Sequence, residues 1–357
     1  MSDFPTHPDQ VSAAWLNAVR DGQETAFPGS IEHVSWEPIG TGQVGDSVRF
    51  HLKHADSATS TMAAKFPAAN KESRTTAAML GLYAKEVRFY QSVAPKLTVR
   101  TPKVFHAAVK EDGSEFILLF EDLGPAEIGN QLTGCNLEQA RAAIKQAAAL
   151  HSSSWNKPDI VGHDWLHPPE QVTQQVNAMY PHANTVFCER YSEELDPEYL
   201  ALCDALVESP FLRGVGPKAP QCVVHGDFRL DNMLFDVRGG AEPIAILDWQ
   251  TVVAGRAMND IGYFMGCGLG DTLRRAHEDE LLALYCDEME AGGVKLTREE
   301  IWNEYRKGAL SGLTTAVFSA AFVERTERGD ANFLSMARGA CALALEHNAL
   351  KSLEELS

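Results

Sequence analysis

Strand-like and helix-like patterns occupy different parts of this chain, and that separation limits the folds it can adopt. Between about residues 31 and 120, five short runs are rich in strand-forming residues, and the first two alternate apolar with polar side chains. From Asn136 onward, apolar residues recur at helical spacing, interrupted by two apolar runs between residues 222 and 250. Strands gathered in the first third and helices in the remainder predict an α+β fold rather than alternating βαβ units.

The five strand-like runs predict one five-stranded sheet, with strands at 31–36, 47–52, 61–66, 102–107 and 116–120. Helices are predicted beside it at 9–20 and 73–92. Composition turns polar at Glu121, which we take as the boundary between a first domain, 1–120, and a second, 121–357. The second domain is predicted to contain an irregular loop at 157–170 and helices at 137–155, 172–180, 197–209, 260–268, 271–291, 298–325 and 330–354.

The composition argues against several classes of protein. A formal net charge of −18 disfavours a nucleic acid or an anionic membrane as partner, because either would require a basic surface. The seven cysteines are scattered without a C-x-x-C pair, which indicates reduced thiols and a cytoplasmic protein rather than a disulfide framework or a zinc site. The sequence shows no signal peptide and no apolar stretch near the roughly 20 residues that cross a bilayer, so we expect no membrane segment.

Residues 222–250 carry the strongest indication of chemistry. Two short apolar runs, joined by a turn at 236–240, place Asp227 and Asn232 with the first run and Asp248 at the end of the second. Phosphoryl transfer uses one carboxylate to orient the attacking hydroxyl and further oxygen ligands to hold Mg²⁺ on the nucleotide phosphates. Protein kinases have the same interval between their catalytic aspartate and a metal-binding asparagine. The stretch therefore predicts a phosphotransferase.

Three glycines, Gly40, Gly42 and Gly45, lie in the turn between the first two predicted strands. Because strand character resumes at Val48, these glycines do not open a helix as a dinucleotide-binding loop does. The glycine-rich loop of a kinase lies between strands, so that its bare backbone can cover the phosphates of a nucleotide. A plain glycine-rich hairpin remains the alternative.

Lys65 lies in an apolar run, and a buried lysine requires an acidic partner or a phosphate. Glu86, among apolar residues of the following helix, can supply that partner, since a lysine–glutamate pair at about this separation is part of kinase sites. An edge-strand or snorkelling lysine is the alternative. After the fifth strand, the backbone of Glu121, Asp122 and Leu123 is predicted to bind the adenine ring of a nucleotide.

These stretches resemble a known superfamily. The His-Gly-Asp motif at 225–227, with Asn232 and then Asp248-Trp249, is similar to the catalytic motif of aminoglycoside phosphotransferases and choline kinases. The resemblance covers about residues 30–345 and implies a protein-kinase-like fold of two lobes, one β-rich and nucleotide-binding, the other mostly helical and catalytic. It also implies transfer of the γ-phosphoryl group of ATP to a hydroxyl, with Mg²⁺ as cofactor. A narrower resemblance, to the ecdysteroid-kinase-like branch and its bacterial relatives, rests on residues 42–47, 64–67, 86–90, 121–123, 150–155 and 225–235.

By position, the resemblance assigns roles to five residues. Asp227 would accept or orient the hydroxyl proton of the acceptor, and Asn232 and Asp248 would hold Mg²⁺. Lys65 would bind the α- and β-phosphates of ATP, with Glu86 orienting it.

Arg229 has two open interpretations. It stands two residues after Asp227, where protein kinases place a lysine that reaches the γ-phosphate, and its fixed charge could stabilise the transferring group. A surface ion pair with Asp231 or Asp236 is the alternative, and Asp231 itself is expected to be solvated or structural. Asp260 resembles the structural aspartate of the family that accepts N–H bonds from the catalytic loop, with an ordinary N-cap as the alternative.

The expected activity is phosphorylation of a small hydroxyl compound, with steroid-like, hydroxyacyl, amino alcohol and aminoglycoside acceptors all open. An aminoglycoside site would need a cluster of carboxylates. A catalytically silent nucleotide-binding module is the alternative, but it predicts the loss of a catalytic element, and this chain retains them all. A protein kinase is disfavoured, because Gly226 stands where its catalytic loop has arginine and no D-F-G or A-P-E segment follows.

The patterns specify neither the acceptor nor an oligomeric state. Aromatic residues of the second domain are candidates for the walls of the acceptor pocket, with the hydrophobic core as the more common place for such residues. They are Trp155, Trp165, Trp249, Tyr263, Phe264 and Phe318.

Overall fold

The structure is a computed structural model that describes residues 4–21, 29–41, 45–209, 220–323 and 325–354. The chain forms two compact units. Unit 1 comprises Met1–Pro95, Thr101–Pro125 and Asp248–Thr251, and unit 2 comprises Lys96–Arg100, Ala126–Leu247 and Val252–Ser357. The assignment of nucleotide binding to 1–120 and of catalysis to 121–357 stays a prediction.

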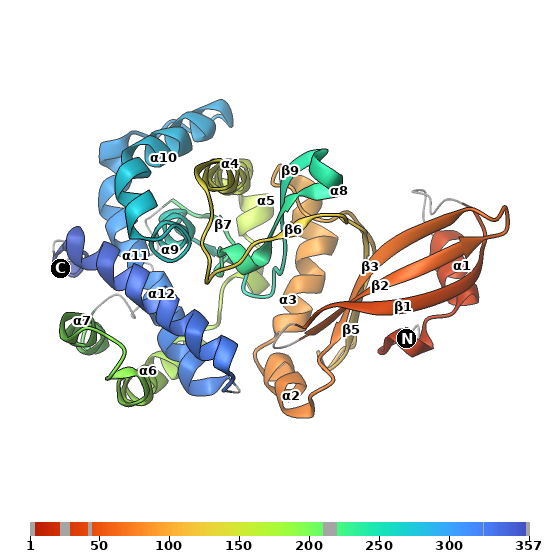
Figure 1. Cartoon of the computed structure of the whole chain (residues 1–357), viewed down its shortest axis with the longest axis horizontal. Helices are drawn as coiled ribbons and strands as arrows, with labels where there is room; N and C mark the ends of the chain where they lie inside the picture. The colour runs from red at the N-terminus through yellow and green to blue at the C-terminus, as the bar shows by residue number, and fades with distance from the viewer. Residues whose placement is uncertain (1–3, 22–28, 42–44, 210–219, 324, 355–357) are drawn as a thin grey trace. The chain divides into compact units, whose positions relative to one another are not determined.

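The sheet of unit 1 contains five antiparallel strands in the order β1-β2-β3-β5-β4 (Figure 1). Every second side chain along much of β2 and β3 is buried, so one face of the sheet lies on the core. The predicted five strands are therefore confirmed, and the first three extend further than the patterns indicate. The strands are β1 (Ile31–Thr41), β2 (Gly45–His54), β3 (Thr59–Pro67), β4 (Val104–Val109) and β5 (Phe116–Glu121).

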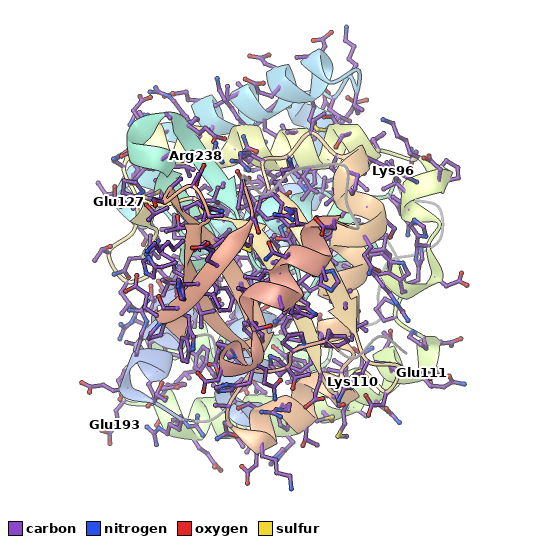
Figure 2. The ribbon with its side chains drawn as sticks, turned by 90° about the vertical axis from the view of Figure 1, so that its right-hand side faces the viewer. Lys96, Lys110, Glu111, Glu127, Glu193 and Arg238 are labelled. Carbon is purple, nitrogen blue, oxygen red and sulfur yellow. The ribbon has the colours of Figure 1, made fainter. Side chains whose placement is uncertain are left out.

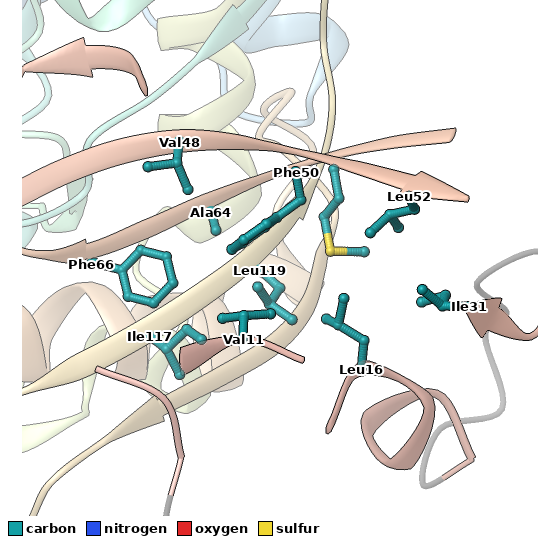
Figure 3. Close-up of a cluster of buried hydrophobic side chains, with 11 residues drawn as sticks. Val11, Leu16, Ile31, Val48, Phe50, Leu52, Ala64, Phe66, Ile117 and Leu119 are labelled. Carbon is teal, nitrogen blue, oxygen red and sulfur yellow. The ribbon is translucent and has the colours of Figure 1, made fainter. Parts of the chain in front are cut away.

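A cluster of buried apolar side chains covers that face of the sheet (Figure 3). Phe50 of β2 and Phe66 of β3 meet edge to face, with ring centroids 6.3 Å apart. Leu16 reaches the cluster from helix α1 (Ala13–Asp21) and is fully buried. The helix begins later than the predicted residue 9, because residues 8–10 form a separate 3₁₀ turn that is capped by His7.

The predicted helix at 73–92 is wrong as a single element. It is divided into α2 (Lys71–Met79) and α3 (Leu82–Arg88), and a π-helical turn follows at Phe89–Val93. Gly81 separates the two helices with a φ of 67°, a left-handed conformation that glycine adopts without steric cost and that commonly ends helices. The periodic apolar pattern continues across this break, so the pattern alone did not reveal it.

Residues 248–251 return to unit 1 after the chain has passed through unit 2. Trp249 is fully buried there and stacks on Phe89, with ring centroids 4.1 Å apart and an interplanar angle of 10°. Trp249 is therefore part of the core of unit 1, and its backbone holds the preceding residue, Asp248, beside α3.

Charged side chains project into solvent at the turn between β4 and β5, where Lys110 and Glu111 extend from unit 1 (Figure 2). Lys110 pairs with Glu115, which also lies 3.8 Å from Arg74 of α2. Exposed pairs of this kind contribute roughly 0–1 kcal/mol each. The stability of unit 1 therefore depends mainly on its apolar core.

Unit 2 is mostly helical, with short strands among the helices, and the predicted α+β fold is confirmed. One small sheet has the order β6-β8-β9, and β7 pairs separately with β10. Its strands are β6 (Glu127–Ile128), β7 (Cys222–Val224), β8 (Met233–Asp236), β9 (Glu242–Ile246) and β10 (Val253–Gly255). Its helices are α4 (Leu137–Ser154), α5 (Pro158–Val161), α6 (Glu170–Tyr191), α7 (Pro197–Val207), α8 (Val237–Gly240), α9 (Met258–Cys267), α10 (Asp271–Ala291), α11 (Arg298–Phe322), α12 (Glu327–Glu346) and α13 (Lys351–Glu354).

Helix boundaries differ from the prediction where packing overrides local signals. Helix α6 continues through Pro181 to Tyr191, although an internal proline costs roughly 3 kcal/mol. Phe187 and Tyr191, beyond the proline, are buried, and burying each stabilises by about 1.5–3 kcal/mol, which offsets that cost. The predicted helix at 330–354 ends instead at Glu346, because Asn348 adopts a φ of 52°.

Helices α9 and α11 pack at very short range in unit 2. A Cβ on Gly308 of α11 would lie 1.9 Å from the carbonyl oxygen of Met258, and one on Gly262 of α9 would lie 2.3 Å from the backbone of Gly308. Only glycine therefore fits at this crossing, which sets the position of α9. In the described part of the chain, no helix is long and apolar enough to span a membrane.

Candidate functional site

The first candidate cluster lies in unit 1, around Lys65 of β3. Its Nζ donates to Oε1 and Oε2 of Glu86 at 3.0 and 2.9 Å, and to Oδ1 of Asp248 at 3.0 Å. Glu86 of α3 is only 1% exposed, and its Oε1 also accepts the backbone N–H of Trp249 at 3.3 Å. The predicted Lys65–Glu86 pair is present, and the edge-strand alternative is wrong because Lys65 lies on a central strand of the sheet.

Electrostatics keep the ammonium of Lys65 charged. Burial lowers the pKa of Lys65, but the negative charges of Asp248 and Glu86 outweigh that effect and raise the pKa above its ordinary value. One ammonium is thus shared by two carboxylates, and the formal charges of the three groups sum to −1. A cation beside Asp248 would balance that charge.

Asp248 has an unusual backbone conformation for an aspartate, with a φ of 60°. Its side chain is 39% exposed, in contrast to that of Glu86. A left-handed non-glycine residue is more costly than an ordinary one, and such residues cluster at functional sites. The conformation supports a functional role for this residue.

Two glycines of the predicted phosphate loop, Gly40 and Gly45, lie near the end of β1 and at the start of β2. A Cβ on Gly45 would lie 3.1 Å from the carbonyl oxygen of Phe66 and 3.2 Å from Cε of Lys65, so this position packs directly against the lysine. Gly40 pairs with Ser47, and a Cβ on Gly40 would lie 3.9 Å from Cβ of Ser47. Gly42 lies outside the described residues.

The predicted adenine-binding segment follows β5 in unit 1. The carboxylate of Asp122 accepts two hydrogen bonds from Arg49, at 2.6 and 3.2 Å, and one from the N–H of Gly124. Its side chain is therefore structural. Glu121 ends β5, and the backbone of Leu123 makes no hydrogen bond to any residue that the structure describes. The free backbone groups of Leu123 suit the predicted contact with a nucleobase.

The second cluster lies in unit 2, in the loop after β7. Asp227 accepts hydrogen bonds from Tyr263 at Oδ1 (2.7 Å) and, at Oδ2, from Arg229 (3.0 Å) and Asn232 (2.9 Å). Burial raises the pKa of Asp227, but the charge of Arg229 and the hydrogen bond from Tyr263 outweigh it, so its pKa lies below the ordinary value. The carboxylate is therefore ionised and held in one orientation.

Arg229 makes both kinds of contact that the sequence left open. Its Nε binds Asp227, and its Nη1 lies 3.1 Å from Oδ2 of Asp231. Its side chain is 22% exposed, so the pair is not a simple surface pair. No contact with Asp236 is found among the described residues.

Asp231 is structural rather than solvated. Beyond Arg229, its carboxylate accepts from the backbone N–H of Gln131 at 3.0 Å, from Asn332 at 3.2 Å and from Arg328 at 3.3 Å. Arg328 and Asn332 tie the loop that carries Asp227 to the start of α12, and Gln131 ties it to the segment before α4.

Asp260 of α9 supports the same loop from below the surface. It is 1% exposed and accepts the backbone N–H groups of His225 (2.8 Å) and Gly226 (3.0 Å). His151 of α4 lies 3.3 Å from its Oδ2. The expected hydrogen bonds from the loop that carries Asp227 are present, and the N-cap alternative is wrong, since Ala257 is the N-cap of α9.

Comparison with known proteins settles the family. The sequence profile of the ecdysteroid kinase-like family matches residues 47–297, more than half of the chain. The chain belongs to the ecdysteroid kinase-like family. The resemblance seen in the sequence is thereby confirmed, and the chain is a member of a family of kinase-like phosphotransferases.

Solved structures with a similar fold have sequences that are only distantly similar to this chain. A candidate aminoglycoside phosphotransferase from Ralstonia eutropha is 18% identical, with a TM-score of 0.57, and the match covers 94% of this chain and 97% of that one. An ethanolamine kinase from Plasmodium vivax is 12% identical, with a TM-score of 0.48 and coverage of 88% and 84%. No curated protein sequence matches the chain. The first likeness confirms the predicted kinase-like fold.

Oxygen atoms that can act as ligands of Mg²⁺ occur in both clusters. In unit 2, Nδ2 of Asn232 donates to the backbone oxygen and Oδ2 of Asp227, each at 2.9 Å, which leaves Oδ1 of the amide for a cation. In unit 1, the Lys65 cluster carries an excess negative charge at Asp248. Among the described residues, no three His, Cys, Asp or Glu side chains converge as a metal site, so an ion at either cluster would also require phosphate oxygens. The residues fit Mg²⁺ bound to a nucleotide.

Sequence reasoning did not identify Tyr263 as a partner of Asp227; it was named only as a possible pocket wall. The signal was present, because Tyr263 follows Asp260 by three residues on one helix, and residues at that spacing share a face. Phe264 is fully buried against Phe228 and belongs to the core.

Proposed function

We propose that the protein transfers the γ-phosphoryl group of Mg²⁺-bound ATP to a hydroxyl of a small organic molecule. The observation that supports this most strongly is the ionised, three-fold hydrogen-bonded carboxylate of Asp227 beside Arg229 and Asn232. We further propose that residues 1–120 bind the nucleotide and residues 121–357 provide catalysis and acceptor binding.

In the proposed reaction, the acceptor oxygen forms a bond to the γ-phosphorus, and the bond from that phosphorus to the β,γ-bridging oxygen breaks, so ADP leaves. Asp227 accepts a hydrogen bond from the hydroxyl that is to be phosphorylated, and it receives the proton of that hydroxyl late in the step. Because the transition state of phosphoryl transfer is loose, orientation of the hydroxyl matters more than the basicity of the carboxylate. A carboxylate with a lowered pKa suits that role.

Each remaining residue has a separate task in the proposal. Lys65, oriented by Glu86, would bind the α- and β-phosphates of ATP. Asn232 and Asp248 would hold Mg²⁺, which when bound neutralises charge on the phosphate oxygens. Arg229 would place positive charge beside the transferring group while also fixing Asp227.

The proposal also assigns the residues that bind the nucleobase and cover the phosphates of ATP. The backbone of Glu121, Asp122 and Leu123 would bind adenine, and the glycines at 40, 42 and 45 would cover the phosphates. We also propose that the protein acts in the cytoplasm, since all seven cysteines are described and none forms a disulfide.

Charge at the catalytic loop favours a neutral acceptor over an aminoglycoside. Asp227 is paired with Arg229, and Asp231 is paired with both Arg229 and Arg328. Each of these two carboxylates is therefore already matched by an arginine. A polycationic acceptor would need carboxylates that are not already neutralised.

The test compares the wild-type protein with Asp227→Asn in a library of neutral alcohols, amino alcohols and aminoglycosides, with ADP release and phosphorylated product measured together. We expect a neutral alcohol to be phosphorylated and Asp227→Asn to reduce kcat by about a hundredfold to ten-thousandfold while retaining ATP binding. Asp279→Asn, at a side chain that is 93% exposed, is the matched control and should behave as wild type.

Two results would contradict the proposal. If Asp227→Asn retains turnover within a few-fold of wild type, another group orients the acceptor. If ATP and Mg²⁺ bind but no compound in the library receives phosphate, the enzymatic function is wrong and a nucleotide-binding module is favoured.

A further inference from the structure

Both carboxylate oxygens of Asp227 are occupied by donors from its own unit. An ionised carboxylate offers about four lone-pair positions for hydrogen bonds. Arg229 and Asn232 fill the two positions on Oδ2, and Tyr263 fills one of the two on Oδ1. A single position remains, and it lies on the oxygen that Tyr263 binds.

Tyr263 is well placed to control that oxygen. It is 1% exposed on α9, and its hydroxyl donates to Oδ1 over 2.7 Å, a short charge-assisted hydrogen bond. Its other neighbour at that end is Sδ of Met336, 4.0 Å away, which is a weak acceptor and does not compete for the proton. The phenol is therefore committed to Asp227.

The rest of α9 keeps the phenol fixed. Asp260, one helical turn earlier on the same face, binds the backbone of His225 and Gly226. Gly262, between Asp260 and Tyr263 on α9, packs directly against the backbone of Gly308 of α11. Neither the helix nor the loop can shift without breaking several of these contacts.

We propose that Tyr263 is a positioning residue that sets the orientation of the Asp227 carboxylate and leaves one lone pair on Oδ1 for the hydroxyl of the acceptor. The inference rests on the proposed phosphotransfer function. Without the phenol hydroxyl, the carboxylate can rotate about its Cβ–Cγ bond, and its free lone pair no longer points in one direction. Misorientation of a catalytic group by a small amount reduces rate far more than it reduces binding.

The test uses Tyr263→Phe, which removes the hydroxyl and keeps the ring. Tyr305→Phe is the matched control, because Tyr305 is also fully buried and its hydroxyl donates to a carboxylate, Glu278, over 2.5 Å. Both variants lose one buried phenol–carboxylate hydrogen bond, so both should lose a similar amount of thermal stability. Only Tyr263→Phe should lose turnover.

We expect Tyr263→Phe to lower kcat by roughly ten- to a hundredfold with the KM for ATP unchanged, and Tyr305→Phe to change neither. The rates to be measured are hydrolysis of Mg²⁺-ATP by water and transfer to any acceptor found in the library. A second readout needs no turnover: in protein with ¹³Cζ-labelled tyrosine, the resonance that Tyr263→Phe removes should shift in Asp227→Asn.

The outcomes separate the inference from the function on which it rests. If wild type transfers phosphate and Tyr263→Phe matches Tyr305→Phe in kcat, Tyr263 is merely structural and the inference is wrong. If the tyrosine resonance is unchanged in Asp227→Asn, the contact itself is absent. If wild type transfers no phosphate to water or to any acceptor, the proposed function fails and the inference fails with it.

Discussion

The carboxylate of Asp260 gives the sharpest test of how the loop that carries Asp227 is held. Replacing it with asparagine preserves its shape but turns one of its two oxygens into an NH₂ group. Since the two oxygens accept different backbone N–H groups, one of His225 and Gly226 must then face another donor. Hydrogen bonds to charged groups contribute about 1.5–3 kcal/mol each, and a buried donor left unpaired costs about 1–3 kcal/mol.

We therefore expect Asp260→Asn to destabilise the closed loop by about 2–4 kcal/mol. At a factor of ten for each 1.4 kcal/mol, the backbone amides of the loop should exchange with solvent roughly 30- to 700-fold faster. Hydrogen–deuterium exchange of a peptide covering 223–228 measures this directly. A peptide from β2 in unit 1 should be unaffected, and Asp279→Asn provides a control for loss of a charge at an exposed site.

One result would refute this reasoning. If exchange in the 223–228 peptide changes by less than about threefold, the hydrogen bonds to Asp260 do not hold the loop closed. The amide introduced by Asp260→Asn would then find its hydrogen-bond partners in another way.

The remaining predictions concern stability and nucleotide binding. Lys65→Met should abolish ATP binding, as measured by calorimetry, and cost about 3–5 kcal/mol by leaving a buried carboxylate unpaired; adding Glu86→Leu should restore much of the stability but not the binding. Glu346→Gln should lower the thermal midpoint at pH 7, because the hydrogen bond from Arg274 lowers the pKa of Glu346 to about 2. A carboxyl with a lowered pKa stabilises the folded state at pH values above its ordinary pKa of 4.5. The difference in stability between wild type and Glu346→Gln, about 1 kcal/mol, should therefore shrink as the pH falls from 4.5 towards 2. A difference that stays constant over this range would contradict the prediction. Gly308→Ala gains about 1 kcal/mol of helix propensity but should still destabilise by about 1–3 kcal/mol in a denaturant titration, because its Cβ would overlap a backbone carbonyl of α9.

Much of the fold followed from local patterns, because strands and helices impose different spacings on their apolar residues. The five strands of unit 1 were predicted, although the first three run longer than the patterns indicate, and the helices α4, α9 and α10 were predicted close to their observed limits. The predictions fail where a single residue ends a helix through its backbone conformation, or where tertiary packing overrides a local signal. Gly81 breaks a continuous helical pattern by its backbone conformation alone, and Pro181 fails to end α6 because buried side chains beyond it offset its cost.

The candidate site shows the same division. Spacing along the chain was enough to select Asp227, Asn232 and Asp248, since the first two are five residues apart and the third ends the next strand-like run. It could not show that Lys65 would also contact Asp248, 183 residues away. Nor could it show that Arg229 would bind two carboxylates at once. Such partners are fixed by tertiary packing, which a spacing rule does not encode.

Helix α9 shows how that packing acts on the proposed chemistry. Its face holds three consecutive residues of the loop: Asp260 binds the backbone of His225 and Gly226, and Tyr263 binds the side chain of Asp227. Gly262 lies between these two on the helix and allows α11 to approach within backbone contact. A larger residue at this crossing would displace α9 and, with it, both supports of the loop. Substitutions there should therefore reduce turnover as well as stability, although no atom of Gly262 contacts the carboxylate of Asp227.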